Sequence, residues 1–78
     1  MSYKYHRLSH QVRKLFPGER RGTQQHITNK ITNVIRSVKT DVYDIHISLT
    51  DKISPFQYSV SREIVVNNTT IYLHFLVD

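Results

Sequence analysis

The sequence predicts an α+β protein in which two helices pack on one face of a three-stranded antiparallel β-meander (ααβββ). Apolar residues recur every three or four positions up to residue 39, which is typical of helices, and at alternate positions from residue 42, which is typical of strands. The pair Asn67-Asn68 separates the last two alternating runs and suits a two-residue hairpin turn. The 78 residues predict one small domain, 1–78, with a basic helical half, 1–39, and a β-meander half, 40–78.

A first helix is predicted near residues 4–16. Its apolar residues form one stripe at helical spacing: Tyr5, Leu8, Val12, Leu15 and Phe16. Pro17-Gly18 should end this helix, because proline disfavours helical geometry in the residue before it and glycine tolerates a turn.

A second helix is predicted near residues 24–39. Its apolar stripe is Ile27, Ile31, Val34, Ile35 and Val38. Thr23 is the expected N-cap, since its hydroxyl can accept a hydrogen bond from a backbone N–H of the first turn. Arg36 and Lys39 suit the negative end of the helix dipole.

Three strands are predicted near 42–50, 57–66 and 69–77. With Asn67-Asn68 as the turn, the register of the last two strands follows from the pattern, and the expected same-face pairs are Val66–Thr69, Ile64–Ile71, Arg62–Leu73, Val60–Phe75 and Tyr58–Val77. Arg62 interrupts this apolar face. We expect it to stack on Tyr43 or to lie at the end of the sheet with its head in water; a functional buried arginine is the alternative.

The charges are divided unequally along the chain. Residues 1–39 contain nine lysines and arginines and one acid, Glu19, a balance of +8, whereas residues 40–78 have a balance of −3. Such asymmetry indicates an anionic partner for the basic half. The polar face of the first helix has no acid at all, and its cations could follow a phosphate backbone or simply form a solvated face.

The second helix presents Gln, Asn and Arg opposite its apolar stripe, and these residue types can form paired hydrogen bonds with base edges. Contact with phosphates and an inert polar surface are the alternatives. We therefore expect a non-enzymatic basic module that binds nucleic acid, DNA or RNA, through its N-terminal helical half. The residues predicted to bind are Lys4, Arg7, Arg13, Lys14, Arg20, Arg21, Gln25, Asn29 and Arg36.

The alternative function is that of a small regulator or inhibitor that binds an acidic surface of another protein, by pairing with an exposed strand edge. In a meander the last strand lies at an edge, and "TTIYLHFLVD" contains no proline or lysine that would block pairing. The residues predicted for this partner or homodimer edge are Thr70, Tyr72, His74 and Leu76.

His46, Ser61 and His74 are expected in one row across the outer face of the sheet, and Asp44, Glu63 and Tyr72 in the next. In a meander the two histidines would stand about 10 Å apart, too far to share one metal. An open sheet face also provides no pocket for catalysis. We therefore expect no catalytic residues, no metal and no cofactor.

The chain has no cysteine, so neither a disulfide nor a thiolate metal site supports the fold. The N-terminal segment lacks the continuous apolar region of a signal peptide, and the apolar run "IYLHFLV" is far shorter than a membrane-spanning helix. These observations favour a soluble, cytoplasmic protein that does not associate with a membrane.

Overall fold

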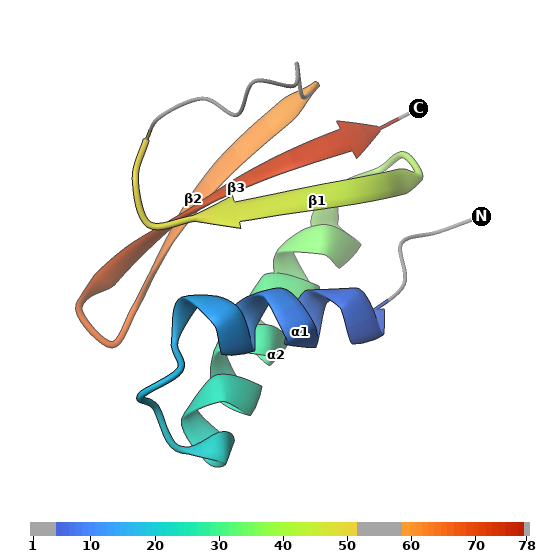
Figure 1. Cartoon of the computed structure of the whole chain (residues 1–78). Helices are drawn as coiled ribbons and strands as arrows, with labels where there is room; N and C mark the ends of the chain where they lie inside the picture. The colour runs from blue at the N-terminus through green and yellow to red at the C-terminus, as the bar shows by residue number, and fades with distance from the viewer. Residues whose placement is uncertain (1–4, 52–58, 78) are drawn as a thin grey trace. The chain divides into compact units, whose positions relative to one another are not determined.

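The computed structural model describes residues 5–51 and 59–77. Two helices precede one three-stranded antiparallel sheet, so the predicted α+β class and the order of elements are confirmed (Figure 1). The elements are α1 (Tyr5–Leu15), α2 (Arg21–Ser37), β1 (Val42–Ser48), β2 (Val60–Val66) and β3 (Thr69–Val77). The chain divides into two compact units, of which one holds both helices (Lys4–Lys39) and the other holds the strands.

The two helices of the helical unit contact each other, and apolar side chains of both are buried. Leu8 and Val12 of α1 are fully buried, as are Ile27 and Ile31 of α2. These side chains recur every three or four residues, so the predicted periodicity is the pattern that places them on one side of each helix.

The start of α2 differs from the prediction. The helix begins at Arg21 with Arg20 as its N-cap, and no side chain caps it with a hydrogen bond. Thr23 is therefore not the N-cap, because it already lies within the first helical turn. At the other end, the N–H of Val38 donates to the carbonyl oxygen of Ile35 at 3.1 Å.

The segment between the helices forms a turn after Phe16, as the Pro17-Gly18 pair predicts. The N–H of Phe16 donates to the Val12 carbonyl oxygen at 2.9 Å, and the N–H of Glu19 donates to the Phe16 carbonyl oxygen at 3.2 Å. Neither Gly18 nor Gly22 has a positive φ. The glycines are therefore not required by the backbone conformation of this segment.

The register of the β2–β3 hairpin agrees with the prediction. Val60 pairs with Phe75, Arg62 with Leu73, Ile64 with Ile71, and Val66 with Thr69. Asn67 and Asn68 both have positive φ, 51° and 61°, as the two central residues of a type I′ turn require. The predicted partner of Val77, Tyr58, lies outside the described residues.

The order of the strands differs from a meander. β3 lies between β1 and β2 and is antiparallel to both (Figure 1). The central strand carries the fully buried Ile71, Leu73 and Phe75, whereas β2 exposes three consecutive polar residues, 61–63. A sheet is stabilised most when its most apolar strand lies between two other strands and its charged residues lie on an edge strand.

The predicted partner edge is therefore wrong. Neighbouring strands flank β3 on both sides, so Thr70, Tyr72, His74 and Leu76 do not lie at an edge of the sheet. Residues of β1 and β2, such as His46 and Ser61, already pair with β3 on its two sides. They occupy the pairing positions next to Tyr72 and the rest of β3 that a second molecule would need. A further strand cannot pair with β3, because both of its sides are already paired.

Arg62 is not a buried functional arginine. Its side chain is exposed, and its Nη1 donates to the carbonyl oxygen of Ser61 at 2.9 Å. Tyr43 lies on β1, which β3 separates from the strand of Arg62. The head group of Arg62 is therefore at the surface and is not stacked on Tyr43. Of the two placements expected for Arg62, the one with its head group in water agrees with this exposure.

Candidate nucleic-acid interface

The cations of the helical unit lie on its surface. Arg7, Arg13 and Lys14 are exposed on α1, and Arg20 and Arg21 are exposed at the start of α2. Glu19 is the single acid between residues 4 and 39. The first predicted binding residue, Lys4, lies outside the described residues.

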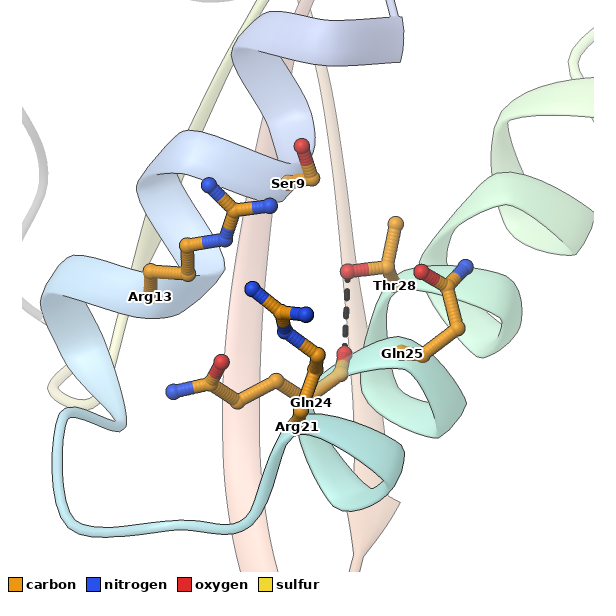
Figure 2. A pocket seen from close by; sticks show the side chains of 6 residues that line it. All are labelled: Ser9, Arg13, Arg21, Gln24, Gln25 and Thr28. Carbon is orange, nitrogen blue, oxygen red and sulfur yellow. Dashed lines mark hydrogen bonds between the residues drawn. The ribbon is translucent and has the colours of Figure 1, made fainter.

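A small hollow lies between α1 and α2, inside the helical unit (Figure 2). It is lined by Ser9, Arg13, Arg21, Gln24, Gln25 and Thr28, and its volume is about 20 Å³. Pockets for drug-sized ligands measure about 300–1,000 Å³, whereas roughly 10–15 Å³ admits one water molecule. The hollow therefore suits a small group of atoms and excludes a whole base or nucleotide.

Helical spacing brings these six residues to one place. Ser9 and Arg13 are separated by one turn of α1, and the four residues from α2 are spaced so that they share one face of that helix. Figure 2 shows the side chains of Arg13 and Arg21 directed from different helices toward the space between them.

Two hydrogen bonds fix the walls of the hollow. The Oγ1 of Thr28 donates to the Gln24 carbonyl oxygen at 3.0 Å, and the Nε2 of Gln24 donates to the Phe16 carbonyl oxygen at 2.8 Å. Thr28 is buried, which leaves its side chain little freedom to move. The Thr28 hydroxyl and the Gln24 Nε2 are therefore bonded within the protein. Arg13 and Arg21 are the charged residues among those that line the hollow.

The start of α2 adds positive potential near Arg21. The first turn contains no acidic residue, and no side chain caps its backbone N–H groups. The unpaired N–H groups and the dipole at a helix N-terminus favour a negative charge. The first turn of α2 therefore reinforces the field of the surrounding arginines.

The two residues predicted to read bases bond to each other. The Nε2 of Gln25 donates to the Oδ1 of Asn29 at 2.9 Å, and both side chains are exposed. The Thr32 hydroxyl donates to the Thr28 carbonyl oxygen at 2.9 Å, so its donor is used within the helix. Gln25 lines the hollow, which places a base-reading group beside the two arginines.

Arg36 does not belong to this group of residues. It lies in the last turn of α2, whereas Arg21 is the first residue of the helix. At 1.5 Å per residue the two are separated by roughly 22 Å along the helix axis. Of the predicted binding residues that the structure describes, Arg13, Arg21 and Gln25 line the hollow, whereas Arg7, Lys14, Arg20, Asn29 and Arg36 do not.

Sequence reasoning missed Ser9 and Gln24 as members of the site. Each lies on its helix at a spacing of three or four residues from a predicted arginine, Ser9 from Arg13 and Gln24 from Arg21. That spacing was a usable signal. The spacing indicates a shared site only once it is known that these faces of α1 and α2 line the same hollow.

The row of His46, His74 and Ser61 exists on the sheet, but its geometry differs from the expectation. His74 pairs with His46 on one side and with Ser61 on the other. The Ser61 Oγ lies 2.9 Å from His74 Nδ1, and the two imidazole rings are stacked with centroids 6.3 Å apart. The histidines are therefore on adjacent strands, because β3 is central, and are not two strand spacings apart.

The second expected row is not formed as predicted. Tyr72 pairs with Glu63 on β2 and with Ser48 on β1, while Asp44 pairs with Leu76. The register of β1 with β3 is regular from Asp44 to Ser48, so the pairing of His46 with His74 places Asp44 opposite Leu76 and not beside Tyr72. Residues 5–51 and 59–77 contain no group of three or more His, Cys, Asp or Glu side chains that could hold a metal ion.

Comparisons of the chain with protein-family models, with curated proteins and with solved structures give no match. In the described part of the chain, neither helix is long and apolar enough to cross a membrane. The function must therefore be inferred from the surface of the protein itself.

Proposed function

We propose that this protein is a non-enzymatic module that binds nucleic acid through its helical unit. The observation that carries the proposal is the hollow that Arg13 and Arg21 line together, in a helical unit whose exposed cations far outnumber its single acid. The hollow is too small to enclose a small-molecule substrate. Its charge instead suits an extended anion that lies on the surface.

A nucleic-acid backbone is the anion that such a surface fits best. Each Lys or Arg that neutralises a phosphate releases condensed counterions, and this release drives binding independently of sequence. Arg7 and Lys14 lie two helical turns apart on α1, so together they span roughly 10 Å. Arg20 and Arg21 extend the positive surface to the start of α2.

The salt dependence of binding tests the proposal. Affinity for a random duplex DNA, a single-stranded DNA and an RNA should be measured by fluorescence anisotropy over a range of salt concentrations. For the duplex, the log–log slope should be near −0.9 for each phosphate neutralised, and for single strands near −0.7. Charge reversal of Arg7 and Lys14, or of Arg20 and Arg21, should weaken binding to all sequences and flatten the slope.

Arg62→Glu is the matched control, because it reverses an exposed cation that belongs to β2 and not to the helical unit. It should change affinity much less than reversal of a single arginine beside the hollow. No binding of the unaltered protein to any nucleic acid at low salt would refute the proposal. An acidic surface on another protein would then be the better candidate partner.

A further inference from the structure

We infer that Arg13 and Arg21 hold one and the same phosphate of a nucleic-acid backbone in the hollow between α1 and α2. The inference rests on the proposed function and adds to it a defined subsite. The salt slope of the unaltered protein alone would not distinguish two arginines on one phosphate from two arginines on separate phosphates, whereas the slopes of substituted variants do.

Two like charges converge at a hollow whose lining residues include no acid. Arg13 comes from α1 and Arg21 from α2, and both line the same hollow of about 20 Å³ (Figure 2). The other lining residues, Ser9, Gln24, Gln25 and Thr28, are uncharged. A single anion between the guanidinium groups would remove their mutual repulsion and pair with both.

The donors of the two arginines fit a phosphate. A guanidinium group presents its N–H donors in a planar fork that matches two oxygens of a phosphate. The hollow has room for an oxygen-sized group, and its walls are held by the bonds of Thr28 and Gln24 described above. A phosphate oxygen can therefore enter, while the sugar and the base remain outside.

Arg13 and Arg21 differ in position from the neighbouring cations. Lys14 and Arg20 are adjacent in sequence to Arg13 and Arg21, but neither lines the hollow. We therefore assign a shared phosphate to Arg13 and Arg21, whereas Lys14 and Arg20 face other parts of the backbone or act through their general field.

The test is a set of charge-neutral substitutions measured on one random duplex DNA over a salt series. Arg13→Gln and Arg21→Gln should each weaken binding by about tenfold, the effect of losing a charge-assisted hydrogen bond. The double variant is decisive. If both arginines hold one phosphate, the magnitude of its salt slope falls by about 0.9 in total, whereas two separate phosphates would lower it by about 1.8.

Lys30→Gln is the matched control, since Lys30 is an exposed cation of α2 that does not line the hollow. A loss equal to that of the arginine variants would show a general charge effect and overturn the inference. Arg13→Lys preserves the charge without the fork, so it should weaken binding while the slope is kept. If circular dichroism shows that Arg13→Gln is unfolded, Arg13→Ala takes its place in the double variant.

The outcomes separate the two proposals. If the unaltered protein does not bind the duplex at low salt, the proposed function and the subsite both fail. If it binds, but the double variant loses about 1.8 from the slope, nucleic-acid binding stands and the shared phosphate is refuted.

Discussion

The side-chain amide of Gln24 donates a 2.8 Å hydrogen bond to the Phe16 carbonyl oxygen and so ties α2 to the residue that follows α1. Phe16 is the last residue before Pro17, and its carbonyl also accepts the N–H of Glu19. One oxygen therefore joins the end of the first helix, the turn and the second helix. The hollow lined by Arg13 and Arg21 depends on that junction.

Gln24→Ala should lower the free energy of unfolding by about 1 kcal/mol, the net value of a typical intramolecular hydrogen bond. Urea denaturation followed by circular dichroism measures this change. The neighbouring Gln25→Ala is the control, because Gln25 bonds only to Asn29 at the surface, and it should cost about 0.5 kcal/mol or less. Equal losses for the two variants would contradict a special role for the Gln24–Phe16 bond.

Ser61→Ala should also lower stability by about 1 kcal/mol, because it removes the Oγ that lies 2.9 Å from Nδ1 of the buried His74. Ser59→Ala is the control in the same part of the chain, since Ser59 is exposed and precedes β2. It should change stability by less than about 0.5 kcal/mol. Chemical denaturation of both variants at one pH provides the comparison, and no difference between them would count against the Ser61–His74 contact.

The hairpin turn should respond strongly to the residue at position 68. Asn68 has a φ of 61°, which a β-branched side chain disfavours and glycine adopts freely. Asn68→Val should therefore lower the midpoint of thermal unfolding, with a cost of about 1–2 kcal/mol, while Asn68→Gly should maintain or raise it. A valine variant as stable as the glycine variant would contradict the type I′ turn.

Gly22→Ala should stabilise the protein by about 0.4–1 kcal/mol, since alanine restricts the unfolded chain and is a better helix former. Gly22 is the second residue of α2, its φ is not positive, and a Cβ at this position would meet no atom within 4 Å. Differential scanning calorimetry should show a higher unfolding temperature. A lower temperature would mean that the glycine serves a conformation different from the one described.

The paired amides of Gln25 and Asn29 provide a test of base reading. A preferred sequence should first be selected from a random duplex pool. If the amides read bases, replacing both with alanine should weaken binding to the preferred sequence by about 1–3 kcal/mol for each base contact that is lost and should barely affect random DNA. An equal loss on both ligands would instead indicate that these side chains contact only the backbone.

Much of this fold follows from local patterns. The 3.6-residue spacing of Leu8 with Val12 and of Ile27 with Ile31 and Ile35 predicts the helices, and Asn67-Asn68 fixes the β2–β3 register. The strand order does not follow, because the first strand shows the same alternation whether it lies beside β2 or β3. Pairs such as Ile45–Phe75 and Ile47–Leu73 are as apolar as those expected in a meander.

The charged and apolar residues of the last two strands contained a signal that the prediction did not use. Arg62 and Glu63 make β2 the natural edge, and the apolar run "IYLHFLV" makes β3 the natural centre. For the binding surface, sequence identified the cations and the asymmetry of charge. It could not identify the hollow, because the meeting of Ser9 and Arg13 with Gln24 depends on how α1 and α2 pack.

The central position of β3 has a consequence for the order in which the protein takes shape during synthesis. β1 is complete at Ser48, but its partner strand ends only at Val77, 29 residues later. At a translation rate of about 5–20 residues per second, β1 waits roughly 1.5–6 s with Ile45 and Ile47 unpaired. The helical unit precedes the strands and can form while the ribosome is still making them. The sheet, in contrast, is completed in a single late step, when the last strand joins both of its neighbours.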